Sequence, residues 1–130
     1  GQLFIDFCLK VLNMYGNITH VYCDSAEQTL INGLKSAARK NGLGWLRIDD
    51  ALKEVITERI RLTNRMMAQM RFSYMPEMCD TLVSALCTAI WNPKEITVDE
   101  RLDDGTSDID TLDAFEYTIE RYIKKFIRYE

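Results

Sequence analysis

The chain has 130 residues, of which 47% are hydrophobic and 28% are charged, and its net charge is −4. This provides enough apolar surface for the core of one domain, so we expect a single globular domain over residues 1–130. No run of 18 apolar residues occurs, and the first residues lack the basic flank and cleavage site of a secretory signal. These features exclude a membrane-spanning helix and favour a cytoplasmic protein.

The cysteine and histidine content argues against a zinc site. The four cysteines form no Cys-x-x-Cys pair, and His20 is the single histidine. Three of the cysteines lie within apolar runs, where cysteine behaves as a small hydrophobic side chain. We therefore expect the thiols to be reduced and buried.

The first half of the chain predicts four elements. Apolar residues recur at the spacing of one helical face up to Gly16 and Asn17, a pair typical of a helix end. Ser25 and Gln28 form the capping-box pattern of a second helix start. The predicted elements are a helix over 3–15, a strand over 20–23, a helix over 26–40 and a strand over 43–48.

The second half is predicted to be mostly helical. Apolar residues follow the helical period loosely over 51–70, so one bent helix and two short helices are both compatible with this stretch. Pro76 ends an alternating run that is typical of a strand. The other predicted elements are a strand over 71–75, a helix over 77–91 and a last helix over 108–128.

This order of elements indicates the fold class. Helices that alternate with strands are typical of an α/β fold with parallel strands. Two or three short strands are too few for an independent sheet, which suggests that the chain is part of something larger. We therefore expect a helix-rich α/β chain with two or three short strands.

Charge is strongly segregated along the chain. Nine basic and four acidic residues lie between 35 and 71, whereas ten acidic and two basic residues lie between 92 and 120. The basic stretch either contacts DNA phosphates, through Arg59, Arg61 and Arg65, or forms the solvated side of an amphipathic helix. The lack of a recognisable groove-reading motif favours the second interpretation.

Asp24 directly follows the predicted strand over 20–23. This places its carboxylate at the carboxyl end of a buried strand, where open α/β sheets present their binding crevice. The same position also suits a helix-entry aspartate that binds free backbone N–H groups. Both interpretations, metal ligand and helix cap, are open from the sequence.

Residues 103–113 hold five aspartates in eleven positions. Ser107 and Asp110 form a capping-box pattern, so a capped, solvated helix start explains part of this crowding. Asp113 lies three residues after Asp110 on the same helical face, where like charges repel unless a cation offsets them. Mg²⁺ or Mn²⁺ bound by these carboxylates would relieve the repulsion and support phosphodiester cleavage. Spacing alone favours the capped helix.

Three stretches together carry a family resemblance: YCDSAEQTLING at 22–33, DDALKEVITERIRLTNRMM at 49–67 and DDGTSDIDTLDAFEYTIE at 103–120. In this order they resemble the later part of the nuclease domain in the large terminase subunit of tailed bacteriophages. The resemblance implies a ribonuclease H-like nuclease fold and a metal-dependent endonuclease, a phosphodiester hydrolase. Such an enzyme cuts concatemeric viral DNA during genome packaging.

The resemblance also implies roles for individual residues. Asp24 matches the metal carboxylate that follows the family's second catalytic strand, and Asp110 matches the ligand at the start of the final helix. Asp113 matches the second acid of the closing motif, and Glu27 matches a recurrent acid without an assigned role. Asp24 and Asp110 would then be the catalytic ligands of Mg²⁺ or Mn²⁺, with Asp113 as a further ligand.

In the family, the first catalytic aspartate lies on a strand upstream of the region that matches this chain. The ATPase domain and its GxxxxGK[ST] loop are likewise not present in these residues. We therefore expect an incomplete nuclease fold, weak metal binding and little or no cutting by this polypeptide alone. Apolar faces left uncovered in such a fragment are expected to favour self-association.

The resemblance implies partners and a location as well. The partners are double-stranded DNA, the terminase ATPase domain, the small terminase subunit and the portal, within the cytoplasm of a bacterial host that carries the phage or prophage. A membrane is not among them. The alternative function is a non-catalytic helical module that docks a packaging-motor or portal partner.

Overall fold

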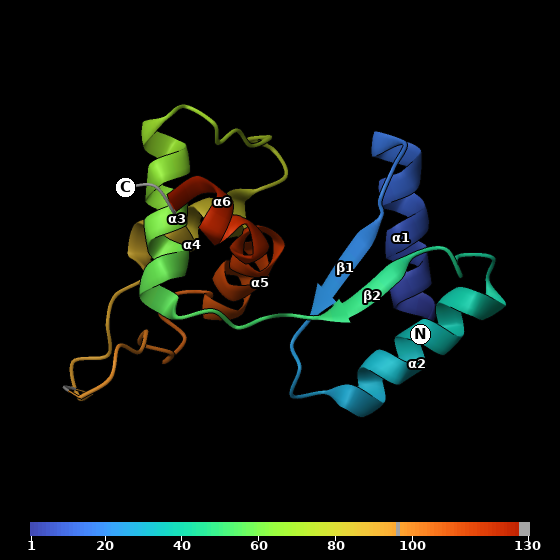
Figure 1. Ribbon diagram of the computed structural model, residues 1–130, viewed down its shortest axis with the longest axis horizontal. Coiled ribbons are helices and arrows are strands. Elements are labelled where there is room, and N and C mark those ends of the chain that lie inside the picture. Colours follow the sequence, from blue (N-terminus) through green and yellow to red (C-terminus); the bar gives the residue numbers. More distant parts are fainter. Residues whose placement is uncertain (96, 128–130) are drawn as a thin grey trace. The chain divides into compact units, whose positions relative to one another are not determined.

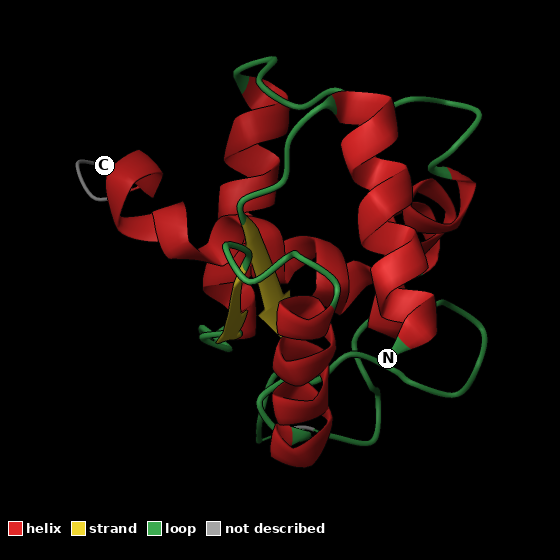
Figure 2. Cartoon of the chain, turned by 90° about the vertical axis from the view of Figure 1, so that its right-hand side faces the viewer, coloured by secondary structure: helices red, strands yellow, loops and turns green. Residues whose placement is uncertain are grey.

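The computed structural model describes residues 1–95 and 97–127, and the chain divides into two compact units, Gly1–Ala51 and Leu52–Glu130. This division does not test whether the two units form one domain, so the expected single domain over residues 1–130 stays a prediction. Helices make up most of the ordered structure, and the described strands form one short parallel pair (Figure 1, Figure 2). This is a helix-rich α/β architecture, and its described pair of strands agrees with the expectation of two or three short strands. The helices in the described part of the chain lack the length and the apolar composition of a membrane span.

The first unit is a β–α–β arrangement preceded by a helix. Its elements are α1 (Gln2–Tyr15), β1 (His20–Cys23), α2 (Gln28–Lys40) and β2 (Arg47–Asp50). Helix α1 ends at Gly16, whose φ of 77° is the left-handed conformation that glycine adopts readily. The strands are parallel, with Cys23 opposite Asp50, which confirms the expected parallel pairing. Helix α2 provides the crossover that parallel strands require.

Two boundaries in this unit differ from the predicted ones. The capping box at Ser25 does not form, because Gln28 Nε2 donates instead to the Ser25 carbonyl at 3.0 Å and no side chain caps α2. The second strand begins at Arg47 and not at residue 43. A turn precedes it, in which Leu46 donates its N–H to the carbonyl of Leu43 at 3.0 Å.

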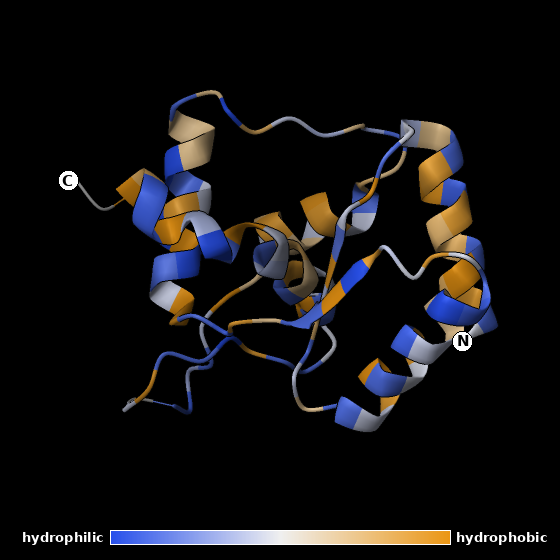
Figure 3. Ribbon diagram, turned by 45° about the vertical axis from the view of Figure 1, so that its right-hand side comes forward, coloured by the Kyte–Doolittle hydropathy of each residue, from blue (hydrophilic) through white to orange (hydrophobic). Residues whose placement is uncertain are grey.

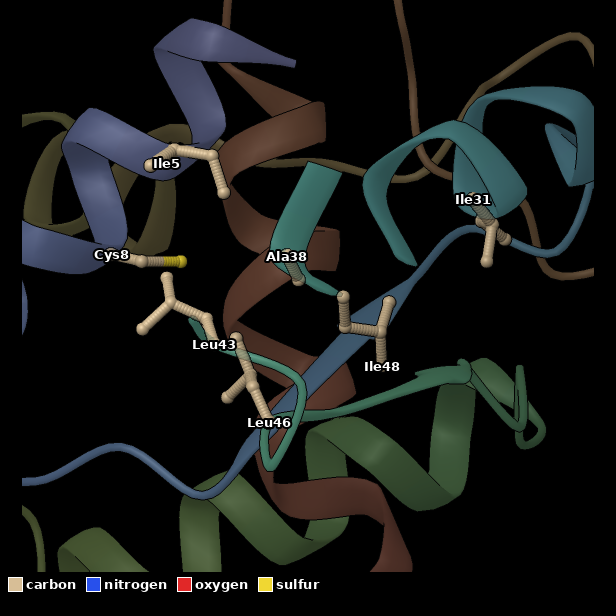
Figure 4. Close-up of a cluster of buried hydrophobic side chains, with 7 residues drawn as sticks. All are labelled: Ile5, Cys8, Ile31, Ala38, Leu43, Leu46 and Ile48. Carbon is tan, nitrogen blue, oxygen red and sulfur yellow. The ribbon is translucent and has the colours of Figure 1, made fainter. Parts of the chain in front are cut away.

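A cluster of buried apolar side chains holds the first unit together (Figure 4). Ile48 of β2 belongs to it, and its register partner Val21 on β1 packs against it. Both helices contribute to the same cluster, so α1 and α2 cover one face of the strand pair. The buried members are Ile5, Cys8, Ile31, Ala38, Leu43, Leu46 and Ile48.

Helix α1 also carries apolar side chains that are exposed. Leu3 is 86% exposed and Phe7 is 63% exposed, and Leu9, Met14 and Tyr15 are exposed as well. Apolar residues, drawn in orange, recur along the α1 ribbon (Figure 3). Isolated exposed apolar residues are common on proteins, but Leu3, Phe7 and Met14 recur at the spacing of one helical face and so form an apolar stripe on α1.

The second unit is a set of packed helices. They are α3 (Ile56–Ala68), α4 (Asp80–Thr88), α5 (Ile109–Ile119), the 3-10 helix η1 (Glu120–Tyr122) and α6 (Ile123–Ile127). The stretch over 51–70 therefore holds one helix, and the helix predicted over 77–91 is shorter at both ends. The long final helix is interrupted by η1, and residue 128 of that prediction lies outside the described residues.

The predicted strand over 71–75 is wrong. Met70 has a φ of 56°, which ends α3, and the Arg71 N–H donates to the Met66 carbonyl at 2.8 Å. Phe72 then packs edge-on against Phe115 of α5, with the ring centroids 5.5 Å apart. The alternating pattern thus comes from an aromatic side chain that anchors an irregular segment to a helix.

The cysteines are free thiols. The expected burial is confirmed for Cys8, which lies in the core of the first unit. Cys23 and Cys79 are half-buried, and Cys87 is exposed. The expected burial is therefore wrong for Cys87 and only partly met by Cys23 and Cys79.

Ile5 and Leu3 of α1 provide a matched test of the first core. Ile5 is 1% exposed, so Ile5→Ala should lower the free energy of unfolding by about 2–5 kcal/mol, because it removes buried methyl groups and leaves a cavity. Leu3→Ala on the same helix should change it by less than about 0.5 kcal/mol. Urea unfolding followed by circular dichroism measures both. Equal effects of the two substitutions would contradict the assigned core.

Candidate functional site

Two carboxylates lie at the carboxyl edge of the parallel strand pair. Asp24 follows β1 directly, and Asp50 is the last residue of β2, paired with Cys23. Both aspartates are exposed. The carboxyl ends of parallel strands meet at one edge, which is where α/β sheets bind ligands.

Local hydrogen bonds fix both of these side chains. Asp24 Oδ1 accepts from the backbone N–H of Ala26 at 3.0 Å, which closes a turn before α2 but does not cap the helix, because the N-cap is Glu27 and no side chain caps α2. Asp50 Oδ1 accepts from Gln28 Nε2, also at 3.0 Å. Burial and, next, the negative charge of Asp50 raise the pKa of the Cys23 thiol, whereas the positive charge of Lys35 lowers it.

Sequence reasoning missed Asp50 as a residue of this edge. Asp49 and Asp50 lie beyond the predicted strand over 43–48, whereas the observed strand β2 includes both of them. The apolar run that ends at Ile48 was the available signal for a strand. The strand continues for two residues beyond this run and so includes Asp50.

The start of α5 is the second acidic region. Asp108 is the N-cap, and its Oδ1 accepts from the Thr111 N–H at 2.9 Å. The predicted cap, Ser107, instead shares a hydrogen bond of 2.8 Å with the Thr88 hydroxyl. Asp110 is exposed in the first turn. Asp103, Asp108 and Asp110 border a shallow concavity of about 320 Å³.

Some of the clustered aspartates make hydrogen bonds to residues near them in the sequence. Asp104 Oδ1 accepts from the Thr106 hydroxyl at 2.7 Å and from its N–H at 3.0 Å. These bonds favour the charged form, so they hold the pKa of Asp104 below its ordinary value. Asp104 and Asp108 are therefore used by a turn and by a helix cap.

Asp113 belongs to a buried ion cluster with Glu116, Arg59 and Arg101, which we call the arginine–carboxylate cluster. Arg101 Nη1 donates to Glu116 Oε1 at 2.7 Å and to Asp113 Oδ1 at 3.1 Å, and its Nη2 donates to Glu116 Oε2. Arg59 Nη1 lies 3.2 Å from Glu116 Oε1 and 3.6 Å from Asp113 Oδ1. The cluster joins α3, α5 and the segment that precedes residues 103–108, which we call the acidic loop.

The three arginines expected to contact DNA differ in position. Arg59 is 8% exposed and lies in the arginine–carboxylate cluster, so a contact between Arg59 and DNA would require these ion pairs to open. Arg61 is exposed and lies 3.8 Å from Glu58, and Arg65 is partly exposed. Only Arg61 and Arg65 therefore offer positive charge at the surface of α3.

The carboxylates provide the oxygen donors that Mg²⁺ and Mn²⁺ prefer. Too few of them lie together to surround an ion, because the described residues contain no group of three or more His, Cys, Asp or Glu side chains that could hold one. Asp24 belongs to the first unit and Asp110 to the second. An ion shared by these two residues stays a prediction.

A separate groove of about 430 Å³ lies between α3, α4 and the residues that follow α4. Its walls are mainly apolar, and Ile90 and Trp91 at its border are exposed. Arg101 and Glu116 of the arginine–carboxylate cluster also line it. Such a surface suits contact with an apolar group better than contact with a phosphate.

Comparisons with protein-family models, curated proteins and solved structures give no significant match to this chain.

Glu116 and Glu58 provide a matched test of the arginine–carboxylate cluster. Glu116→Gln leaves two buried guanidinium groups with one carboxylate, so it should lower the free energy of unfolding by about 3–5 kcal/mol. Glu58→Gln removes a half-exposed ion pair on α3 and should cost less than about 1 kcal/mol. Chemical unfolding of both variants measures the difference. Similar small losses would show that the buried cluster contributes little.

Asp113 gives a test that depends on pH. Burial raises the pKa of its carboxyl above the ordinary value of 3.8, despite the opposing charges of Arg59 and Arg101. A group whose pKa is higher in the folded chain than in the unfolded chain stabilises the fold fully at pH values below the unfolded pKa. This stabilisation is lost as the pH rises through the folded pKa. The stability of the native chain relative to Asp113→Asn should therefore increase as the pH falls from neutral through the carboxyl range. Urea titrations at several pH values check this, and a constant difference would contradict it.

Proposed function

We propose that the chain is a metal-dependent DNA endonuclease module of ribonuclease H-like type. One observation carries the proposal: Asp24 immediately follows β1 in a parallel β–α–β unit, with Asp50 at the end of the neighbouring strand. Open α/β sheets bind ligands at this edge, and an exposed carboxylate there offers oxygen donors to a divalent cation. The resemblance of the three sequence stretches to terminase nuclease domains supports the same function.

In this proposal, Asp24 and Asp110 are the catalytic carboxylates that bind Mg²⁺ or Mn²⁺. Asp113 has two arginine partners, so its carboxylate would be shared between these and a cation. The bound ion would activate water and stabilise the leaving oxygen of a phosphodiester. Arg61 and Arg65 would contact the DNA backbone as positive charges on phosphates.

The proposed biological role is the cutting of concatemeric viral DNA during genome packaging, in a bacterial host that carries the phage or prophage. The proposed partners are double-stranded DNA, the terminase ATPase domain, the small terminase subunit and the portal. Because few carboxylates are available in each unit, we expect this polypeptide alone to bind metal weakly and to cut DNA little or not at all.

A non-catalytic docking module is the second candidate, and a different observation favours it. Helix α1 exposes five large apolar side chains, and the groove beside α4 has exposed apolar borders. Large exposed apolar surfaces are typical of interaction sites. In this case α1 or the groove would bind a helix of a packaging-motor or portal partner, and the aspartates would serve only the loop and the helix cap.

Titration with Mn²⁺ distinguishes the two candidates. If the carboxylates are metal ligands, isothermal titration calorimetry should detect weak Mn²⁺ binding that is lost in Asp24→Asn and in Asp110→Asn. Glu77→Gln should leave it unchanged, because Glu77 is exposed and belongs to neither acidic region. In supercoiled plasmid assays, any residual nicking should disappear with the same two variants.

Each result has a clear meaning. Binding that survives both Asp24→Asn and Asp110→Asn, or that all three variants weaken equally, argues for nonspecific charge and against the nuclease. Absence of Mn²⁺ binding by the native chain favours the docking module.

A further inference from the structure

Arg101 combines full charge with near-complete burial. Its side chain is 7% exposed, and it makes three donor contacts to two carboxylates of α5. The planar guanidinium meets both oxygens of Glu116 side by side, and one of its nitrogens also reaches Asp113. A lysine at this position would keep the positive charge but lose the bidentate contact with the Glu116 carboxylate.

The backbone at Arg101 is fixed as well. Arg101 pairs with Trp91 in an isolated antiparallel bridge. On either side of it, Leu102 donates its N–H to the Ile90 carbonyl at 2.8 Å, and the Asn92 N–H donates to the Glu100 carbonyl at 2.7 Å. The chain therefore enters the acidic loop, residues 103–108, from a point held by both backbone and side chain.

The far end of the acidic loop is held by different contacts. Asp108 caps α5, and Ser107 is hydrogen-bonded to Thr88 of α4. Between the two ends, Gly105 has a φ of 88°, which allows the loop to turn back. Asp103 and Asp108 are thus placed by two anchors, and the first of these is Arg101.

We propose that Arg101 is a positioning residue that fastens the acidic loop to α5 and so sets the position of the Asp103 carboxylate relative to that of Asp110. Arg101 itself contacts neither a cation nor DNA and acts through the loop. Its link to metal binding rests on the proposed nuclease function. Its link to loop order does not, so the two can be tested separately.

Hydrogen exchange measured by mass spectrometry tests loop order without any metal. In Arg101→Gln, the amides of residues 102–111 should exchange about tenfold faster than in the native chain, while the amides of α3 and α4 should change much less. Arg101→Lys should show an intermediate effect and serves as the folded variant if Arg101→Gln does not fold. Lys94→Gln is the matched control, because it removes an exposed positive charge from the same segment.

Mn²⁺ titration of the same variants gives the second readout. Supporting groups around metal ligands commonly change affinity by about 10–100-fold, so Arg101→Gln should weaken Mn²⁺ binding by at least about tenfold and Lys94→Gln should not. Restoration of part of the affinity in Arg101→Lys would identify charge as one component of the effect. Unchanged affinity together with a native loop would contradict the positioning role.

The remaining outcomes separate the two proposals. Faster exchange throughout the second unit would mean that Arg101 only stabilises the fold, and unchanged exchange would mean that it is not an anchor. Either result overturns the inference. If exchange increases only in residues 102–111 while the native chain binds no Mn²⁺, Arg101 is the loop anchor and the nuclease proposal fails.

Discussion

The second unit depends on the neutralisation of two carboxylates on one face of α5. Asp113 and Glu116 lie three residues apart, and Glu116 is 1% exposed. Burial of two like charges at this spacing would be strongly unfavourable without cations. Arg59 from α3 and Arg101 from the segment before the acidic loop supply them. Because each arginine comes from a different part of the chain, the ion pairs connect α5 to both parts.

This constraint gives the crowded aspartates distinct roles. Asp104 closes a turn, Asp108 caps α5, and Asp113 faces inward to the arginines. Asp103 and Asp110 remain at the border of a surface concavity. The sequence pattern of five aspartates is therefore a mixture of folding chemistry and surface charge, and only the surface part is available to a ligand without disturbing the fold.

Local patterns were sufficient to predict much of the first unit. Strand 20–23 has the predicted bounds, and α1 and α2 lie within two residues of theirs, since helical periodicity and Gly16 act over a few residues. Features that depend on distant partners were not predictable. Arg59 resembles its exposed neighbours in sequence and is buried because α5 provides its carboxylates. Likewise, the stretch 71–75 alternates like a strand but forms none among the described residues, and its Phe72 packs on Phe115 instead.

The small size of the sheet has a consequence for how the protein behaves in solution. Among the described residues each strand has one hydrogen-bonded neighbour. Each of β1 and β2 therefore has a second edge whose peptide groups take no part in the pairing between the two strands. An unpaired strand edge is a template on which an extended segment of another chain can pair, and the fit of the side chains decides which segments do so.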